Sequence, residues 1–335
     1  MYKNKKVLVT GGTGMIGKAL VDRLIDAGAE VRVASLDDPS RVGPGVEFFQ
    51  GNLMEWEFCE KITKGMDYVF HVAGIKGSTG IGATRAASFF TPHILMNTLM
   101  MEAAYRANVE RYLFTSSIAV YHPVEVFEED KAWDGPPHPT DRYAAWAKRM
   151  GELQAEAYKV EYGWDKIAIV RPANVYGPYD NFDPGTAMVI PALIARIAGG
   201  EDPLVVWGDG SAIRDFIFAD DCAEGMMLAM QNGADCTPIN LGSGARTSIR
   251  DIVEAICACF DDPPEIVWDT TKPAGQPVRL MDMSRARERI GFVPRTSLQD
   301  GIRQTVEWYL SHRDVAVKRY NVFHQDSFLQ SHAGA

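Results

Sequence analysis

The sequence has little cysteine and no long apolar run. Its five cysteines, among 335 residues, form no C-x-x-C pair and no regular framework, so we expect buried reduced thiols rather than disulfides or metal ligands. No apolar run approaches the roughly 18 residues that a membrane span needs. The start, MYKNKKVLVTGG, passes from a basic tip into a strand-like run and a glycine turn, without the apolar core of a signal peptide. We therefore expect a cytoplasmic protein with no membrane partner and no metal site.

Basic residues are also scarce. The chain has 34 Lys and Arg against 44 Asp and Glu, which gives a net charge of -10. This balance argues against non-specific attraction to nucleic acid or to an anionic membrane. An anionic substrate would have to be held by a few local cations. Hydrophobic residues make up 46% of the chain, enough for one large α/β unit and a smaller lobe.

The first half of the sequence alternates short β-rich runs with helical stretches, two of them at about 87–108 and 142–162. Such alternation is typical of parallel strands joined by crossover helices. We predict an α/β fold, with a doubly wound parallel sheet and a smaller C-terminal substrate-binding domain. The expected nucleotide-binding domain covers 1–172, with later segments at about 212–240 interleaved. The second domain covers mainly 173–311, and 312–335 form a peripheral tail.

A glycine-rich segment, VTGGTGMIG, lies between the first strand and the first helix, with glycines at positions 11, 14 and 17. Glycines allow a tight turn and a close backbone approach, and the helix N-terminus that follows attracts a pyrophosphate. The segment therefore predicts a Rossmann-type dinucleotide site.

The end of the second strand bears on the choice of cofactor. Ser35 stands where an acidic residue would bind a ribose hydroxyl and favour NAD, and Asp37 and Asp38 follow slightly later. Arg41 could instead meet a 2′-phosphate. The two aspartates favour NAD, and NADP stays open.

Seven motifs occur in order along the chain: TGGTGMIG, HVAG, TSSIAVY, AKRMGE, RPANVYGPYDNF, RDFIFADD and GFVPRTSLQDGIRQTVEWY. In this combination the chain resembles the extended short-chain dehydrogenase/reductase family acting on nucleotide sugars, over about residues 5–310. The segment NVYGPYDNFDPGTAMVIPAL is most similar to the GDP-fucose synthase branch. The resemblance implies an NAD(P)-dependent enzyme, a nucleoside-diphosphate-sugar substrate and a homodimer built from two helices of each subunit.

The resemblance also implies roles for individual residues. Ser117 and Lys148 match the catalytic serine and lysine, and the lysine would hold the nicotinamide ribose and lower the pKa of a tyrosine. The implied cofactor-binding residues are Gly11, Thr13, Gly14, Met15, Ile16, Gly17, Ser35, Asp37, Asn52, Leu53, Ala73, Gly74, Lys76, Asn97, Ser116, Lys148, Pro172, Asn174 and Val175. The implied substrate-binding residues are Ser117, Asn174, Met188, Val189, Trp207, Arg214 and Arg279, the two arginines meeting the diphosphate.

The catalytic tyrosine that the resemblance implies does not stand at its expected position. It should stand four residues before the lysine, but that position holds Ala144, and Tyr143 stands five before Lys148. Residues five apart on a regular helix diverge by about 140°. Three hypotheses stay open: Ala144 replaces the tyrosine, Tyr143 reaches the site through a shifted helix start or a π-bulge, or the protein binds nucleotide sugars without turnover.

Two related reactions are disfavoured by residue type. The resemblance places a cysteine and a histidine of the GDP-fucose synthase epimerisation at Ala119 and Met188, and neither side chain can transfer a proton. A 4,6-dehydratase would need Asp-Glu where Ile118 and Ala119 stand. What remains is hydride exchange at carbon 4: epimerisation, oxidation or reduction of a 4-keto sugar, with a GDP-sugar favoured. The alternative is a catalytically silent binding protein.

Overall fold

A computed structural model describes residues 1–77, 84–183, 185–272 and 275–316. At its centre lies a seven-stranded sheet in the order β12-β7-β5-β4-β1-β2-β3, with every neighbouring pair parallel. The strands are β1 Lys6–Thr10, β2 Glu30–Ser35, β3 Glu47–Gln50, β4 Tyr68–His71, β5 Arg111–Thr115, β7 Ile167–Pro172 and β12 Pro238–Leu241. The strand order reverses between β1 and β4, which is where doubly wound sheets bind ligands at the carboxyl ends of their strands. The predicted α/β fold is confirmed.

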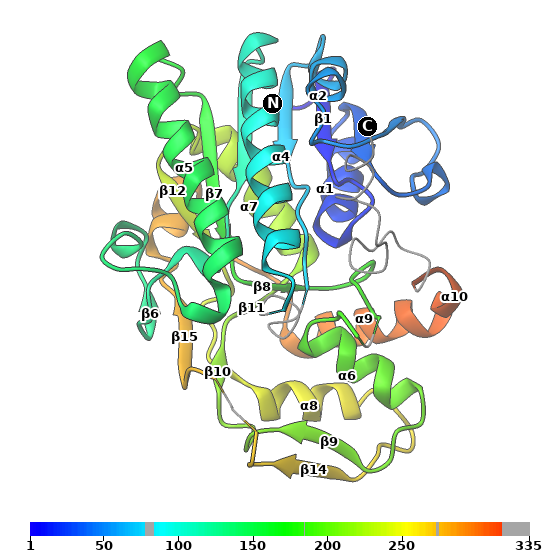
Figure 1. Cartoon of the computed structure of the whole chain (residues 1–335). Coiled ribbons are helices and arrows are strands. Elements are labelled where there is room, and N and C mark those ends of the chain that lie inside the picture. Colours follow the sequence, from blue (N-terminus) through cyan, green and yellow to red (C-terminus); the bar gives the residue numbers. More distant parts are fainter. Residues whose placement is uncertain (78–83, 184, 273–274, 317–335) are drawn as a thin grey trace, which may run out of the picture.

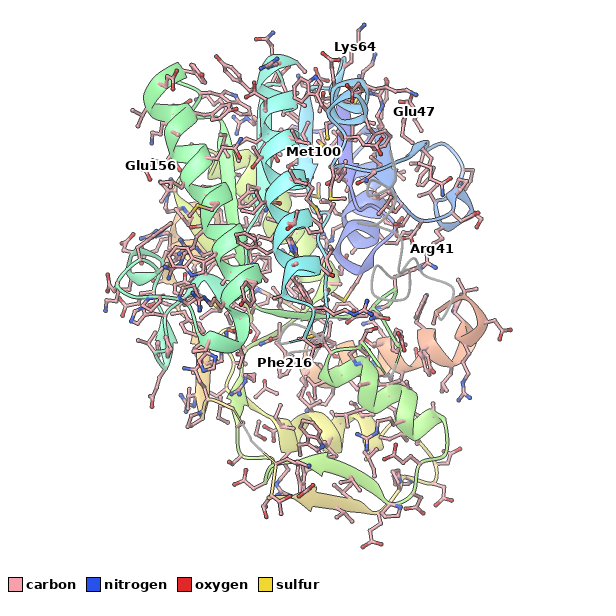
Figure 2. All side chains as sticks on the ribbon, in the orientation of Figure 1. Arg41, Glu47, Lys64, Met100, Glu156 and Phe216 are labelled. Atoms are coloured by element: carbon pink, nitrogen blue, oxygen red, sulfur yellow. The ribbon has the colours of Figure 1, made fainter. Side chains whose placement is uncertain are left out.

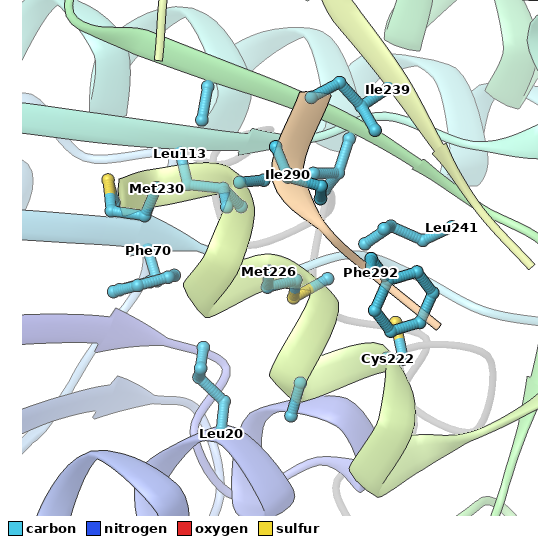
Figure 3. Close-up of a cluster of buried hydrophobic side chains, with 14 of the residues drawn as sticks. Leu20, Phe70, Leu113, Cys222, Met226, Met230, Ile239, Leu241, Ile290 and Phe292 are labelled. Atoms are coloured by element: carbon cyan, nitrogen blue, oxygen red, sulfur yellow. The ribbon is translucent and has the colours of Figure 1, made fainter. Parts of the chain in front are cut away.

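Helices cover both faces of this sheet (Figure 1). They are α1 Met15–Asp26 and α7 Ala219–Asn232 on one face, and α2 Trp56–Thr63, α4 Ala86–Arg106 and α5 Arg142–Tyr162 on the other. Alternate strand residues supply the two cores because successive side chains of a strand point to opposite faces. Figure 3 shows one core, in which Leu20, Phe70 and Met226 meet. Met100 of α4, labelled in Figure 2, is fully buried in the other.

The second lobe lies below the carboxyl edge of the sheet in Figure 1. Its helices are α6 Val189–Ala198, α8 Ile249–Cys257, α9 Leu298–Ser311 and α10 Arg313–Ala316. Its short strands are β8 Asn174–Tyr176, β9 Leu204–Trp207, β10 Ile213–Arg214, β11 Phe216–Phe218, β13 Thr247–Ser248, β14 Ile266–Asp269 and β15 Val278–Met281, with β6 Val126–Phe127 pairing with β15. A third apolar core joins α6, α8 and α9.

The chain passes between the large sheet and the second lobe more than once. After β10 and β11 it returns to the large sheet as α7 and β12, and then enters the second lobe again. Most of the expected tail, 317–335, lies outside the described residues. Within the described part of the chain, no helix is long and apolar enough to cross a membrane, and no group of three or more His, Cys, Asp or Glu side chains is placed to hold a metal ion.

Candidate functional site

The glycine turn connects β1 to α1 at the point where the strand order reverses. Gly11 has a φ of +68°, and a methyl group added to it would lie 2.9 Å from Ala73 Cα. Gly14 caps α1 without a side-chain hydrogen bond, and the first turn of α1 carries no acidic residue. Met15 and Ile16 begin the helix, and a methyl group on Gly17 would meet Gly11 O at 2.1 Å. The helix N-terminus thus presents backbone amides and a partial positive charge, as an anionic pyrophosphate requires.

A buried carboxylate lies directly beside this turn. Thr13 Oγ1 donates to Asp37 Oδ2 at 2.6 Å and lies 2.7 Å from Ser35 Oγ. Ser35 Oγ in turn accepts from Asp37 N at 3.2 Å. The side chains predicted at the end of β2 are therefore brought together with the glycine turn. Arg41 lies in the following short helix, where its Nη1 donates to Val315 O at 3.4 Å.

Asn52 and Leu53 follow β3, next to β2 in the sheet. Asn52 Oδ1 accepts from Met54 N at 3.0 Å, and Leu53 is buried against Cys59, whose Sγ donates to Leu53 O at 3.2 Å. These two residues lie at the same edge of the sheet as Asp37.

The turn after β4 is fixed by Thr10 and His71. Thr10 Oγ1 accepts from Val72 N and Ala73 N, both at 3.2 Å, so its own proton points to His71 Nδ1 at 2.9 Å. His71 Nε2 is then the donor to Asn97 Oδ1 at 3.1 Å. Burial lowers the pKa of His71 to about 3, so the imidazole is neutral at physiological pH.

Asn97 connects this turn to α5. Its Nδ2 donates to Ala147 O at 3.5 Å, one residue before Lys148. The asparagine that the resemblance places in the long helix therefore contacts the backbone of α5 next to Lys148.

His93 is a site residue that the sequence analysis missed. Its Nδ1 donates to Phe89 O at 2.7 Å, which leaves Nε2 to accept from Ile75 N at 3.1 Å. Burial, with Lys148 adding to it, lowers the pKa of His93 to about 3. A methyl group on Gly74 would lie 3.5 Å from His93 Nε2 and 4.0 Å from Lys148 Nζ. His93 stands four residues before Asn97 and so on the same helix face, which was the signal available in the sequence.

Lys148 lies in the second turn of α5, and its side chain is buried. Its Nζ donates to Thr115 O at 2.7 Å, at the end of β5. Burial lowers the pKa of Lys148 to about 8, while the carboxylate of Glu152 acts in the opposite direction. The ammonium is therefore held at the carboxyl edge of the sheet, close to the turn that contains Gly74.

The two serines after β5 have different partners. Ser117 is half-buried and caps a short helix at 118–120, with its Oγ accepting from Ala119 N at 3.1 Å. Ser116 is buried, and its Oγ donates to Glu152 Oε1 at 2.5 Å. The Glu152 carboxylate also receives Arg171 Nε at 2.9 Å and Nη2 at 2.7 Å. In this structure Ser116 therefore belongs to a buried ionic network beneath the site.

Tyr143 and Ala144 stand in the first turn of α5, which is α-helical from Arg142 to Tyr162. The Tyr143 side chain is 42% exposed, and its ring packs edge-on to Phe90 with a centroid distance of 6.5 Å. Ala144 is half-buried and stands one turn before the buried Lys148. The helix contains no π-bulge that would turn Tyr143 toward the lysine, so the residue on the lysine's face is Ala144.

The strand β8 borders the site from the second lobe, directly after Pro172 and Ala173. Asn174 Nδ2 donates to Asp215 O at 2.8 Å, and Val175 O accepts from Lys76 Nζ at 3.3 Å. Lys76 also donates to Asp180 Oδ1 at 3.0 Å, a partner that the sequence analysis missed. Met188 and Val189 stand at the start of α6.

Two arginines lie side by side on neighbouring strands, because Arg214 of β10 is in register with Arg279 of β15. Arg279 Nη2 donates to Asp141 Oδ2 at 3.0 Å, and Arg214 Nη1 donates to Ile213 O at 2.8 Å. Burial, followed by the charge of Arg279, lowers the pKa of Arg214 to about 10. Two cations held this close together favour an anion beside them.

Trp207 was also a substrate-binding prediction. It is 65% exposed on β9, and Lys272 Nζ lies 5.9 Å from its ring centroid.

Known proteins resemble this chain over most of its length. The chain is 33% identical over 316 residues to the putative GDP-L-fucose synthase 2 of Arabidopsis thaliana, covering 92% of this chain and 93% of that one. An epimerase structure from Methanothermobacter thermautotrophicus matches with a TM-score of 0.85 and 25% identity over 95% of both chains.

A UDP-N-acetylglucosamine 4-epimerase from Methanobrevibacter ruminantium M1, in complex with UDP-N-acetylmuramic acid, matches with a TM-score of 0.80 and 29% identity, covering 92% of this chain and 99% of that one. Residues 7–242 match the model of the NAD dependent epimerase/dehydratase family. With its glycine turn, buried lysine and parallel sheet, the chain belongs to the NAD dependent epimerase/dehydratase family.

Proposed function

We propose that the chain is an NAD-dependent nucleotide-sugar oxidoreductase that exchanges hydride at carbon 4 of the sugar, as a 4-epimerase or a 4-keto reductase. The observation that carries this proposal is the buried Lys148, whose pKa of about 8 leaves it mainly charged at pH 7. It lies at the carboxyl edge of the sheet that also carries the glycine turn, while a pair of arginines lies in the second lobe.

The residues present fit a nicotinamide dinucleotide. The N-terminus of α1 would hold the pyrophosphate, and Asp37 would accept from a ribose hydroxyl. A carboxylate repels a 2′-phosphate, which is why we propose NAD over NADP. The bound nicotinamide would supply or accept the hydride, and Lys148 would hold its ribose.

The sugar nucleotide would lie in the second lobe. Arg214 and Arg279 are the cations that could meet its diphosphate, and Ser117 could orient the sugar oxygen because its hydroxyl proton is not used in the cap that it forms. We favour GDP over UDP because of the likeness to GDP-L-fucose synthase.

The proton-transfer group is what this chain lacks. Hydride exchange at a carbinol carbon requires a base for the hydroxyl proton, and a phenol becomes suitable only when a nearby cation lowers its pKa from about 10. Lys148 supplies that cation, but the position one turn before it carries the methyl group of Ala144. We infer that the chain binds cofactor and substrate and turns substrate over slowly until a phenol stands at position 144.

The test is a matched pair of substitutions at one position. Ala144→Tyr and Ala144→Phe introduce nearly the same ring, and only the first has a proton to transfer. We expect Ala144→Tyr to convert a GDP- or UDP-sugar, followed by product analysis and by nicotinamide absorbance, while the parent and Ala144→Phe do so at least about 100-fold more slowly. If neither variant converts any such sugar, the chain is a silent binding protein and the enzyme proposal fails.

We also propose that the chain forms a homodimer through α4 and α5. These neighbouring helices expose several apolar side chains: Phe90, Leu95, Met150 and Leu153. Such a surface is suited to a second copy of the same helix pair. We expect the parent to sediment at twice the monomer mass and Leu153→Glu to sediment at the monomer mass.

A further inference from the structure

An ion pair connects the turn after β4 to the loop that follows β8. Lys76 Nζ donates to Asp180 Oδ1 at 3.0 Å and to Oδ2 at 3.1 Å, and to Val175 O at 3.3 Å. The two residues are 104 positions apart and belong to different layers, one to the turn after β4 and the other to the loop 177–183. Figure 1 shows β8 at the junction of the large sheet and the second lobe.

The turn that carries Lys76 lies next to two groups proposed to hold the cofactor. Ala73 touches the glycine turn, since a methyl group on Gly11 would lie 2.9 Å from Ala73 Cα. The next residue, Gly74, lies close to Lys148, because a methyl group on Gly74 would lie 4.0 Å from Lys148 Nζ. Lys76 therefore extends from a segment that contacts the glycine turn and lies beside the lysine proposed to hold the nicotinamide ribose.

The loop 177–183 has a second attachment, to the helix that begins at the glycine turn. Lys18 of α1 places its Nζ 5.5 Å from the centroid of the Tyr179 ring. The same ring packs on Trp308 of α9 at 4.7 Å. Tyr179 has a φ of +63°, a conformation that a tyrosine adopts only where its surroundings hold it. The loop is thus fastened to the nucleotide-binding layer at both Lys18 and Lys76.

The partner in this pair is a carboxylate with little access to water. The Asp180 side chain is 2% exposed, and besides Lys76 its Oδ1 accepts only the amide of Asn181, at 2.8 Å, among the described residues. The Lys76 side chain is 34% exposed. Separating the two would leave a buried charge without its counter-ion, so an opening of the loop is opposed by this contact.

We propose that Lys76 and Asp180 form a latch that holds the loop 177–183 against the cofactor-binding turn and sets the rate at which the nicotinamide cofactor leaves. The inference rests on the proposed function and deepens it, because a 4-epimerase keeps one cofactor through many turnovers whereas a reductase must exchange it. A latch of this kind favours retention of the cofactor, as a 4-epimerase requires.

The experiment measures dissociation of NADH and NADPH from the full chain by stopped-flow fluorescence, with excess oxidised cofactor as the displacing ligand. The variants are Asp180→Asn, Lys76→Met and the double variant. The control is Glu201→Gln, which removes a carboxylate from another ion pair of the second lobe, to Arg196. We expect each latch variant to release cofactor at least tenfold faster than the parent, the double variant to match the faster single one, and Glu201→Gln to match the parent.

Two results would overturn the latch alone. The first is that Asp180→Asn and Lys76→Met both release cofactor at the parent's rate. The second is that Lys76→Met speeds release by the same factor whether or not Asp180 is present, which would mean that the lysine acts on the cofactor without Asp180. If Asp180→Asn does not fold, Lys76→Met decides, because its side chain is partly exposed. A parent that binds neither NADH nor NADPH would instead contradict the proposed function, and the latch with it.

Discussion

The first turn of α5 and the turns that follow it face the same site, but their side chains are held to different degrees. In the following turns, Lys148, Arg149 and Glu152 are buried, and each has hydrogen-bond partners on other elements. In the first turn, Tyr143 points toward Phe90 and solvent, and Ala144 offers a methyl group. We infer from this comparison that the framework of the proposed site and its proton-transfer group depend on different residues, so that the first can be complete where the second is missing.

The buried ionic network is the strongest part of that framework. In Arg171→Met the Glu152 carboxylate stays buried without its counter-ion, so we expect the free energy of unfolding to fall by about 3–5 kcal/mol. Arg289→Met removes a comparable but exposed pair with Asp235 and should cost less than about 1 kcal/mol. Urea denaturation of both variants checks this, and equal losses would mean that the network does not support α5.

The burial of Lys148 should appear as a pH dependence of stability. Its pKa falls from 10.5 to about 8, so between these values the unfolded chain binds a proton that the folded chain does not, and stability rises with pH. We expect the difference in unfolding free energy between the parent and Lys148→Met to shift in favour of the parent by up to about 3 kcal/mol from pH 7.5 to pH 10.5. A difference that does not change with pH would contradict a buried, partly desolvated ammonium.

The turn 72–75 depends on a neutral imidazole. His93→Phe removes the acceptor of Ile75 N and should cost about 1–3 kcal/mol of unfolding free energy and weaken cofactor binding. His93→Gln keeps an oxygen that can accept, so it should recover most of both losses. Thermal unfolding and a cofactor titration measure the two effects. If His93→Gln is no more stable than His93→Phe and binds cofactor no more tightly, His93 contributes through packing alone.

The smallest effect is expected at Tyr143. Tyr143 is 42% exposed on the first turn, so Tyr143→Phe should change the free energy of unfolding by less than about 0.5 kcal/mol and should leave the turnover of Ala144→Tyr unchanged. A large loss of turnover would show that Tyr143 reaches the site, and the first turn of α5 would then also contribute to catalysis.

The sequence could predict the parts of this site that are local. The glycine turn, with Gly11 and Gly17, is a contiguous motif between a strand and a helix, and Lys148 is recognised by its neighbours within one helix. The expected helix at 142–162 agrees with α5, and the one at 87–108 with α4 to within two residues at each end.

The parts that escaped prediction depend on long-range pairing. His93, Arg171 and Asp180 act through partners from other elements, 18 to 104 positions away in the chain. An arginine in a buried strand or an aspartate in a loop can have many structural roles. Only the packing of α4, β7 and the loop 177–183 around one edge of the sheet gives these three residues their partners. No local pattern carries that information.

The central claim is that the environment of Lys148 is still set to lower the pKa of a phenol at position 144. The pH dependence of kcat/KM for Ala144→Tyr tests it most directly, with Ala144→Tyr combined with Lys148→Met for comparison. We expect an inflection clearly below the ordinary tyrosine pKa of about 10, and its loss or upward shift when the lysine is removed. An inflection near pH 10 that is the same with and without Lys148 would contradict the claim.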